Sequence, residues 1–567
     1  MKTRKNIKNN MEYPKYKHMI PLLICIYMIG SLLINGMDNK SFLLVITSVA
    51  MVAWFIGERI FPDKVYIDGK GKISKIIYAL MGIFILAVII SQMFSKDYSY
   101  SALVGDSESV MNIFCYIVLF YMAYRYGSEE KNQKIFKWAI ILLSIVTVIM
   151  SMVEFYDIPL ARLWLNNGES LADINRVVLS FGNSNYYGAF CCMIIPLVIK
   201  LWADADSRIN KWAYMLLNAS LMCCIFMSKS TMAIVLMIIT ILGVFLYEFK
   251  AVLKQWKYVI VFILVFIGEV FVINICSGGK LMQLVDIGVS NSDAFVEGNG
   301  EKYIIENIKL NGNRLELEGE NSKIIMEYSD QFIFYDEEEC ILDIDSEGGV
   351  ISFVEEPYNK IEIMISYDKR ANMMLAEVDA GYKETIDFYI KDGEFKGVGA
   401  DGKAVDDISG KYIDYKLNNI FTGRGYIWIN TVSILDEVIF IGKGFGNYVN
   451  VFKQYDYVGL LKSQGTTNII IDRPHNMFLQ YCVDIGIIGT VAMFAMIIYI
   501  LGSWIKQCQK NGRDRSFFSY STFAGTLVFL MFSMLNDSMV VLSPFMWFVL
   551  GINLAVQNKH RNKSGQN

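Results

Sequence analysis

The sequence predicts a polytopic α-helical membrane protein of about 12 transmembrane helices with an inserted extracytoplasmic all-β domain. Hydrophobic residues make up 54% of the 567-residue chain. Apolar runs of about 20 residues, the length that crosses a bilayer as a helix, recur along most of it. The stretch 277–420 departs from this pattern, because it is acidic and its apolar residues often alternate with polar ones. These observations predict a membrane protein that carries one domain outside the bilayer.

Apolar segments divide the chain into twelve candidate spans. The first is too long, and too soon followed by others, to be a cleaved signal peptide, so we expect it to remain as an anchor. The candidates cover residues 17–35, 41–57, 73–94, 108–126, 135–155, 184–202, 211–227, 230–248, 256–276, 476–503, 516–535 and 539–557.

Basic residues in the short connections indicate how the chain crosses the membrane, because Lys and Arg near span ends tend to stay in the cytoplasm. They occur in both terminal tails and in connections at residues 59–75, 125–134, 250–257 and 506–515. We therefore expect a multi-pass protein of the cytoplasmic membrane with both termini in the cytoplasm. The connections that then face outward are 95–107, 156–183 and 277–475.

The outward segment 277–420 is predicted to fold as an all-β domain of the sandwich or jelly-roll type. It holds 31 Asp and Glu against 14 Lys and Arg, whereas the net charge of the whole chain is −4. Stretches such as KIIMEY and KIEIMISY show strand periodicity, and turn signals such as Asn311-Gly312 and Asp392-Gly393 separate such stretches. The acidic charge argues against nucleic acid or anionic lipid as a direct ligand. The expected parts are 1–276 (membrane), 277–420 (β domain), 421–475 (outer catalytic loop with an interfacial helix) and 476–567 (membrane).

Aromatic residues of the β domain have two interpretations. If exposed, they suit a carbohydrate; otherwise they fill the core or the edge strands. The residues concerned are Tyr328, Phe334, Tyr335, Tyr367 and Tyr382.

Chemistry is expected where polar residues gather beside the outer membrane face. Three stretches qualify, at residues 173–190, 419–448 and 472–489. In the second, Arg424 and Trp428 are four residues apart and share a helix face, and Trp favours the membrane interface. Arginines at such an interface can also snorkel to headgroups, which is the structural alternative.

His475 is one of three histidines in the chain, and the other two, His18 and His560, lie in or beside the predicted cytoplasmic tails. The sequence predicts a helix start here, with Asp472 as the cap and Pro474 in the first turn. The positive potential at a helix N-terminus disfavours imidazolium and attracts phosphate. A neutral His475 can accept a proton; alternatively, it is a helix-start residue bonded to a backbone carbonyl.

Glu269 lies inside the ninth predicted span. An acidic side chain inside a span is either a site residue or paired within the helix bundle.

The order of these motifs resembles the O-antigen ligase and O-antigen polymerase family. A large outer loop precedes the last three spans, and Arg424-x-x-x-Trp428 is followed by the Gly-x-Gly stretch at residues 442–448. His475-Asn476 then opens a span that continues through Asp484 to Gly486-Ile487-Ile488-Gly489. Arg176 and Gly182-Asn183-Ser184-Asn185 are similar to the family's Arg and Gly-Asn-Pro-Asn stretch.

The resemblance implies an enzyme that transfers a glycan from an undecaprenyl-diphosphate carrier to an acceptor hydroxyl on a glycan, lipid or protein. It implies no metal, no cofactor and no nucleic acid partner, with the reaction at the outer face of the lipid bilayer. Arg176 and Arg424 would hold the diphosphate, with Lys229 as a third cation, and His475 would take the acceptor proton. Further expected substrate-binding residues are Trp428, Asn476, Asn185 and Glu269.

Two departures from the family pattern bear on the substrate. The eighth span begins Met227-Ser228-Lys229-Ser230-Thr231 where the family often has Ser-Arg, and the acidic β domain is an addition. The motifs are shared by ligases, which use a foreign acceptor, and polymerases, which join carrier-linked units; His475-Asn476 favours the ligase. Non-enzyme alternatives are a carrier of lipid-linked glycans, which predicts charged or broken, repeated helices, and a receptor, which predicts a cytoplasmic output domain.

Overall fold

The chain forms two compact units in a computed structural model. The helical unit comprises Met1–Gly288, Gly444–Gly446 and Ile485–Asn567, and the mixed unit comprises Val289–Lys443 and Asn447–Asp484. The structure describes residues 18–60, 74–95, 108–159, 176–247, 249, 256–281, 303–382, 384–399, 402–408, 420–511 and 516–564.

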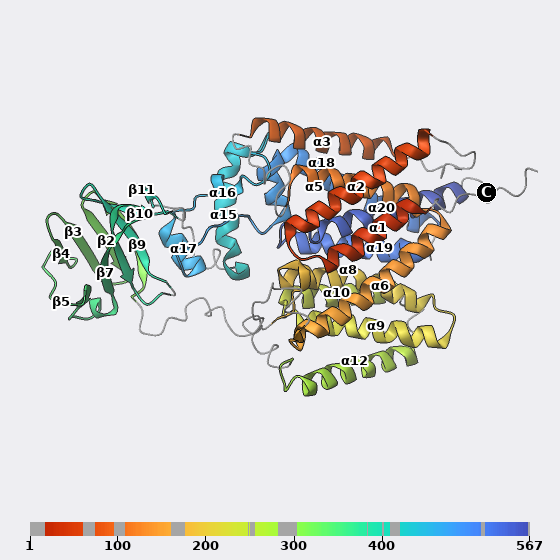
Figure 1. The fold of residues 1–567 in the computed structure, drawn as a ribbon, viewed down its shortest axis with the longest axis horizontal. Coiled ribbons are helices and arrows are strands. Elements are labelled where there is room, and N and C mark those ends of the chain that lie inside the picture. Colours follow the sequence, from red (N-terminus) through yellow and green to blue (C-terminus); the bar gives the residue numbers. More distant parts are fainter. Residues whose placement is uncertain are drawn as a thin grey trace, which may run out of the picture. The chain divides into compact units, whose positions relative to one another are not determined.

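Within the described residues, a helix covers each of the twelve predicted spans (Figure 1). They are α1 (Met19–Leu33), α2 (Met37–Ile60), α3 (Lys75–Phe94), α5 (Val110–Gly127), α6 (Glu130–Phe155), α8 (Ser184–Ala203), α9 (Arg208–Met227), α10 (Thr231–Tyr247), α12 (Trp256–Cys276), α18 (Met477–Asn511), α19 (Phe517–Ser533) and α20 (Ser543–Ser564).

Seven of the helices in the described part of the chain are long and apolar enough to cross a membrane: α2, α3, α6, α8, α9, α12 and α18. The polytopic helical architecture is therefore confirmed, but the count of twelve spans is not. Three further helices, α1, α10 and α19, are apolar but have at most 17 residues. At 1.5 Å per residue such a helix is shorter than a hydrocarbon core of about 30 Å.

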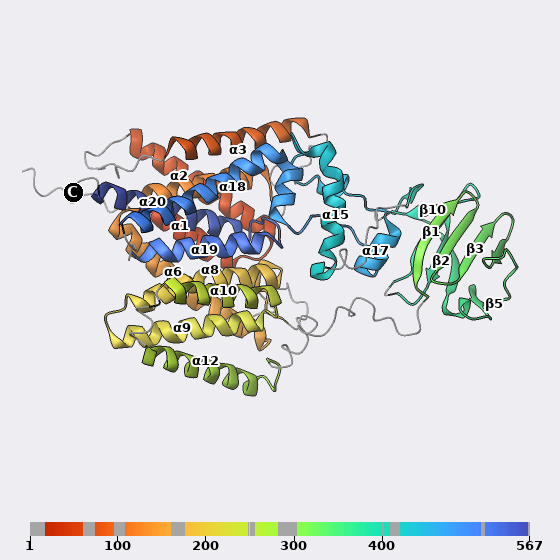
Figure 2. The same ribbon diagram turned by 180° about the vertical axis from the view of Figure 1, so that it is seen from behind.

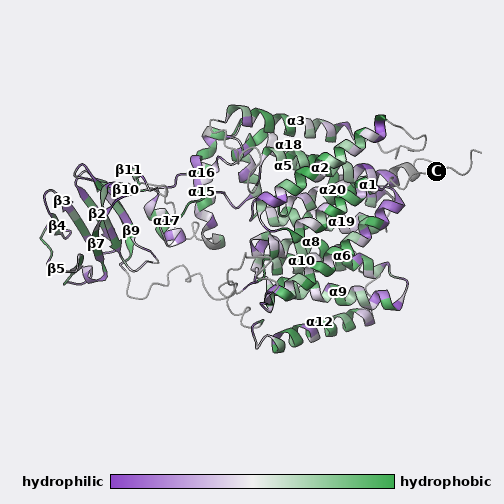
Figure 3. Cartoon of the chain, in the orientation of Figure 1, coloured by the Kyte–Doolittle hydropathy of each residue, from purple (hydrophilic) through white to green (hydrophobic). Residues whose placement is uncertain are grey.

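Burial within the helical unit separates central from peripheral helices. The apolar window of α8 is 78% buried, whereas that of α12 is 6% buried. A side chain at Gly188 of α8 would place Cβ 2.3 Å from Cβ of Ala233 in α10, so only glycine permits this close approach. The exposed face of α12 is apolar, with Leu264 and Phe271 more than 60% exposed, as expected for a helix surrounded by lipid (Figure 3).

Two antiparallel sheets form the β part of the mixed unit (Figure 2). Neighbours in each sheet follow the order of the chain, so both sheets are meanders and lack the crossovers of a jelly roll. The first sheet contains β1 (Ile305–Asn311), β2 (Arg314–Gly319), β3 (Lys323–Tyr328) and β4 (Phe332–Tyr335). The second contains β5 (Ile344–Glu347), β6 (Val350–Phe353), β7 (Glu362–Asp368), β8 (Met373–Asp379), β9 (Ile386–Lys391), β10 (Glu394–Val398) and β11 (Ala404–Val405).

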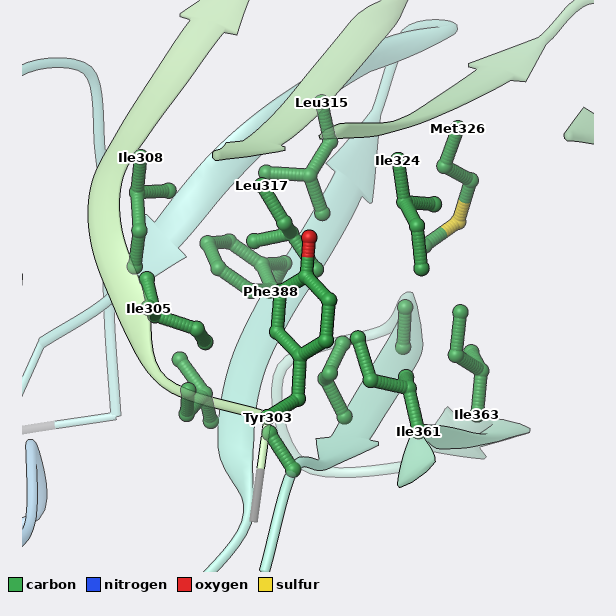
Figure 4. Close-up of a cluster of buried hydrophobic side chains, with 14 of the residues drawn as sticks. Tyr303, Ile305, Ile308, Leu315, Leu317, Ile324, Met326, Ile361, Ile363 and Phe388 are labelled. Carbon is green, nitrogen blue, oxygen red and sulfur yellow. The ribbon is translucent and has the colours of Figure 1, made fainter. Parts of the chain in front are cut away.

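Alternate side chains of both sheets enter one apolar core, which makes the β part a sandwich. Figure 4 shows the ring of Tyr303 among Leu317 of the first sheet and Phe388 of the second. The Tyr303 hydroxyl donates to the carbonyl oxygen of Ser322 at 3.0 Å, which satisfies this polar group inside the core.

The core accounts for most of the aromatic residues that were candidates for carbohydrate binding. Phe334 is 2% exposed and belongs to the core, while Tyr328 and Tyr382 pack against it. A carbohydrate-binding role is therefore wrong for Phe334. Tyr367 is 55% exposed and donates to Asn372 at 3.0 Å.

Helix α17 (Tyr457–Gln464) completes the sandwich core, although it follows the strands by more than fifty residues. Tyr457 and Leu461 belong to the buried cluster. The Tyr457 hydroxyl accepts the N–H of Val398 at 2.6 Å and donates to the carbonyls of Val398 and Asp387 at 2.9 and 3.1 Å. The β sandwich and the segment that precedes α18 thus share one core.

Candidate functional site

In the mixed unit, helix α15 (Ile420–Val438) carries the first pair of predicted site residues. Arg424 and Trp428 are one helical turn apart, as the sequence predicts, and both are partly buried. The indole N–H of Trp428 donates to the carbonyl oxygen of Pro474 at 2.9 Å. This bond ties the Arg424 face of α15 to the residue that immediately precedes His475.

The second pair, His475 and Asn476, lies directly before α18. The helix begins at Met477, and the Oδ1 of Asn476 accepts the N–H of Leu479 at 3.1 Å. Asn476 is therefore the N-cap, and the prediction that Asp472 caps this helix is wrong. Asp472 instead pairs with the neighbouring Arg473 at 2.5 Å.

His475 occupies the left-handed region, with φ of +51°. A non-glycine residue in this region carries backbone strain of about 1–3 kcal/mol, and such residues cluster at functional sites. The conformation places the imidazole directly before the capped helix start, partly exposed. Strain at this residue therefore fits the functional interpretation of His475.

Helix α18 is broken at Gly486, whose φ is +75° and ψ is +169°. Groups other than the helix backbone bond carbonyls on both sides of the break. Val483 O accepts the N–H of Lys443 at 2.8 Å, and Gly486 O accepts the hydroxyl of Thr490 at 2.8 Å. The first bond holds the glycine-rich stretch of residues 442–446 against the first segment of α18.

Gly444 shows why that stretch needs glycine. Its φ is +85°, and an added Cβ would lie 2.9 Å from the Cβ of Ser95. Its N–H donates to the hydroxyl of Ser91 in α3 at 2.9 Å. The sequence predicted a tight turn at residues 442–448. At Gly444 the backbone of this turn packs directly against α3, and any side chain at this position would prevent that contact.

Asp456 is a buried carboxylate that the sequence interpretation missed. It caps α17 by accepting the N–H of Gly459 at 2.9 Å, and it accepts the hydroxyl of Tyr426 at 3.0 Å. Burial raises the pKa of this carboxyl above its ordinary value. Because Tyr426 lies two residues after Arg424, Asp456 anchors the start of α15. The sequence could have indicated Asp456 as a helix cap, because Asp is common before a helix. It could not have indicated the hydrogen bond with Tyr426, which lies 30 residues earlier in the chain.

In the helical unit, the turn between α9 and α10 and the start of α8 bring Lys229 and Asn185 close together. Asn183 caps α8 by accepting the N–H of Asn185 at 2.8 Å. The Oδ1 of Asn185 accepts the hydroxyl of Ser230 at 2.6 Å, next to Lys229. Asn185 therefore fixes the turn that carries Lys229, which has a left-handed φ of +53°.

Two other cations of the helical unit, Arg176 and a residue not predicted, Lys280, lie near enough to Lys229 for their charges to act on it. Burial lowers the pKa of the Lys229 ammonium, and the positive charges of Lys280 and Arg176 lower it further. Among the described residues, Arg176 and Lys229 have no hydrogen bond or ion pair from their side chains. Like charges held together without a counter-ion favour an anionic ligand.

Lys280 lies beyond the end of α12 and reaches the end of α6. Its ammonium donates to the carbonyl oxygen of Phe155 at 3.4 Å and lies 5.4 Å from the centre of that ring. The sequence offers only a basic residue after Gly278-Gly279, so its neighbours were not predictable.

Glu269 has hydrogen-bond partners within the helix bundle. From α12 its carboxylate accepts the hydroxyl of Ser220 at 3.2 Å and the thiol of Cys223 at 3.6 Å, both in α9. The structure therefore groups Arg176, Asn185 and Lys229 in the helical unit, with Glu269 paired between helices. It groups Arg424, Trp428, His475 and Asn476 in the mixed unit.

An apolar pocket adjoins the short 3-10 helix η2 (Leu179–Phe181) of the helical unit. Its lining comes from α1, α8, η2 and the start of α20, and includes Tyr27, Leu32, Phe181, Phe190 and Phe545.

Comparison with known proteins places a family match on the mixed unit and the start of α18. Residues 388–494 match the family model described as O-antigen ligase. The match includes Arg424, Trp428, His475 and Asn476. A search of curated proteins finds no match to the chain.

Proposed function

Because residues 388–494 of this chain match the family model described as O-antigen ligase, we propose that it is a metal-independent inverting glycosyltransferase of the O-antigen ligase type. Its donor is a glycan on an undecaprenyl-diphosphate carrier, and its acceptor is a hydroxyl on a glycan, a lipid or a protein. The reaction takes place at the outer face of the cytoplasmic membrane. The observation that carries the proposal is the bond from Trp428 to Pro474, which joins the two family motifs within the matched segment.

His475 acts as the general base. The acceptor oxygen forms a bond to the anomeric carbon, the bond from that carbon to the diphosphate oxygen breaks, and the acceptor proton passes to the imidazole. The products are the glycosylated acceptor and undecaprenyl diphosphate. Because the nucleophile enters opposite the leaving group, the anomeric configuration inverts. Trp428 and Asn476 hold the backbone on either side of the imidazole.

Cations stabilise the leaving group. Negative charge grows on the diphosphate as the bond to the sugar breaks, so fixed positive charges lower the barrier. Arg424 and Arg176 serve this role, since guanidinium binds phosphate oxygens through two parallel N–H groups, with Lys229 as a weaker third. The positive charges of Arg176 and Lys280, which act on Lys229 in the helical unit, support this assignment.

The runner-up is a polysaccharide polymerase that joins lipid-linked repeat units. Both activities use the same donor and release the same carrier, so the family match agrees with either. The ligase is favoured by His475-Asn476, and the sandwich is a candidate surface for presenting an acceptor.

The test compares purified full-length protein in lipid with His475→Ala, using carrier-linked glycan from its own membranes. Released undecaprenyl diphosphate and product size are measured together. We expect release by the wild type and its loss in His475→Ala, with one shifted product on a foreign acceptor; a ladder would indicate the polymerase. His18→Ala is the matched control, because His18 bonds Asn132 at 2.6 Å within the helical unit. Release by His475→Ala at the wild-type rate would refute the mechanism, and no release by any form would favour a carrier or receptor.

A further inference from the structure

Two buried charges of the helical unit, Lys40 in α2 and Glu154 in α6, have no role in the proposed chemistry. Lys40 is 1% exposed and Glu154 is 7% exposed. Among the residues that the structure describes, neither forms an ion pair. A buried charge costs several kcal/mol unless other groups compensate it, and such residues inside membrane helices usually mark function.

Both charges bind the same short loop, residues 177–181. The two oxygens of Glu154 accept the backbone N–H groups of Val178 and Leu179 at 3.1 and 2.8 Å. The ammonium of Lys40 donates to the hydroxyl of Ser180 at 2.9 Å. The Glu154 carboxylate therefore satisfies two backbone N–H groups of the loop, and the Lys40 ammonium satisfies the hydroxyl of Ser180.

Neighbouring helices complete the attachment of the loop. The N–H of Val177 donates to the carbonyl of Met227 at the end of α9, at 3.0 Å. The hydroxyl of Ser180 donates to the carbonyl of Leu32 at the end of α1, at 2.7 Å. Lys40 also donates to the carbonyl of Ser31 and lies 5.4 Å from the ring centre of Phe181.

The loop is held in a strained conformation. Leu179 has a φ of +47°, which is unusual for a bulky residue. Its N–H is the one that Glu154 binds at 2.8 Å. Strained backbone persists only where the surroundings over-determine it, so the buried charges account for the conformation of Leu179.

Arg176 directly precedes this loop, and its backbone leads into Val177, which is bound to α9. We propose that Lys40 and Glu154 are positioning residues that hold the 177–181 loop so that Arg176 meets the diphosphate of the donor. The inference rests on the proposed function. The two charges act through Arg176 and do not touch the substrate.

The test is a double-mutant cycle in the full-length protein. Glu154→Gln keeps one acceptor oxygen but puts an amide NH₂ against a backbone N–H, so the loop loses one bond. We expect the transfer rate to fall about ten-fold, within the range for residues coupled by hydrogen bonds. In an Arg176→Gln background the same change should have little further effect, because its action passes through Arg176. If Arg176→Gln leaves no measurable rate, Arg176→Lys replaces it.

Lys40→Met is an independent test. We expect the transfer rate to fall about ten-fold in this variant too, and to change little when Arg176 is already replaced. Matched controls lie two helical turns away on the same helices: Thr147→Val in α6 and Thr47→Val in α2. Both are buried hydroxyls that bond carbonyls of their own helix. They test whether any buried polar loss in these helices lowers the rate.

Equal losses with and without Arg176 would overturn the inference, since they would show a general packing role. Unchanged rates in Glu154→Gln and Lys40→Met, or equal losses in the controls, would overturn it too. Failure of the proposed function looks different, because the wild type would then release no undecaprenyl diphosphate at all.

Discussion

The indole N–H of Trp428 lies 2.9 Å from the carbonyl oxygen of Pro474 and donates to it. This bond joins residues 46 positions apart and fixes the backbone that enters the strained His475. The position of the imidazole therefore depends on α15 as well as on α18.

Trp428→Phe keeps an aromatic ring but removes the N–H donor together with part of the indole, a loss of volume that the Trp212→Phe control shares. Loss of one hydrogen bond costs about 0.5–1.5 kcal/mol, so we expect the transfer rate to fall roughly two- to ten-fold, with the fold intact. The measurement is release of undecaprenyl diphosphate by purified protein. Trp212→Phe is the control, because Trp212 is 48% exposed on α9. An unchanged rate in Trp428→Phe would show that the bond does not position His475.

Substitutions of Asn476 should change the stability of the fold, because its side chain caps α18. Asn476→Ala should lower the free energy of unfolding by about 1 kcal/mol through loss of the cap. Asn476→Asp keeps an acceptor oxygen for the N–H of Leu479 and should restore stability. Thermal unfolding in detergent measures both variants. Equal instability of the Asp and Ala variants would contradict the assignment of Oδ1 as the cap.

Tyr457 tests whether the sandwich and α17 are one folding unit. Tyr457→Phe removes a hydroxyl that serves Val398 and Asp387, and leaves the partly buried N–H of Val398 without this partner. We expect a loss of about 1–3 kcal/mol in the free energy of unfolding. Limited proteolysis should cut the sandwich and the segment 447–484 together. In the control Tyr367→Phe, the change affects an exposed hydroxyl and should be neutral.

The buried carboxyl of Asp456 predicts a pH dependence of stability. Because burial raises its pKa in the folded state, the folded protein holds this proton to higher pH than the unfolded chain does. The stabilising contribution is present below the ordinary value of 3.8 and is lost as pH rises through the raised pKa. Asp456→Asn should flatten that fall in a series of thermal unfolding curves. Asp472→Asn, a change at an exposed residue, should leave the fall as it is.

Local patterns in the sequence were sufficient for much of the fold. Each apolar run that was predicted to span the membrane is a helix in the structure, and period-two alternation predicted strands such as β3 and β7. The spacing of Arg424 and Trp428 predicted their common face, because helix geometry is a short-range property. The choice between Asp472 and Asn476 as the cap was not predictable from composition, since both side chains can cap and only the backbone path selects one.

The sequence by itself determined the positions of the apolar helices, the acidic β-rich insertion and the family motifs around His475. Only the tertiary structure decided which side chains act together. Lys40 meets Ser180 across 140 residues, and Glu154 meets Leu179 across 25. Burial of apolar faces depends on local periodicity, whereas compensation of a buried charge depends on groups that packing brings from elsewhere in the chain.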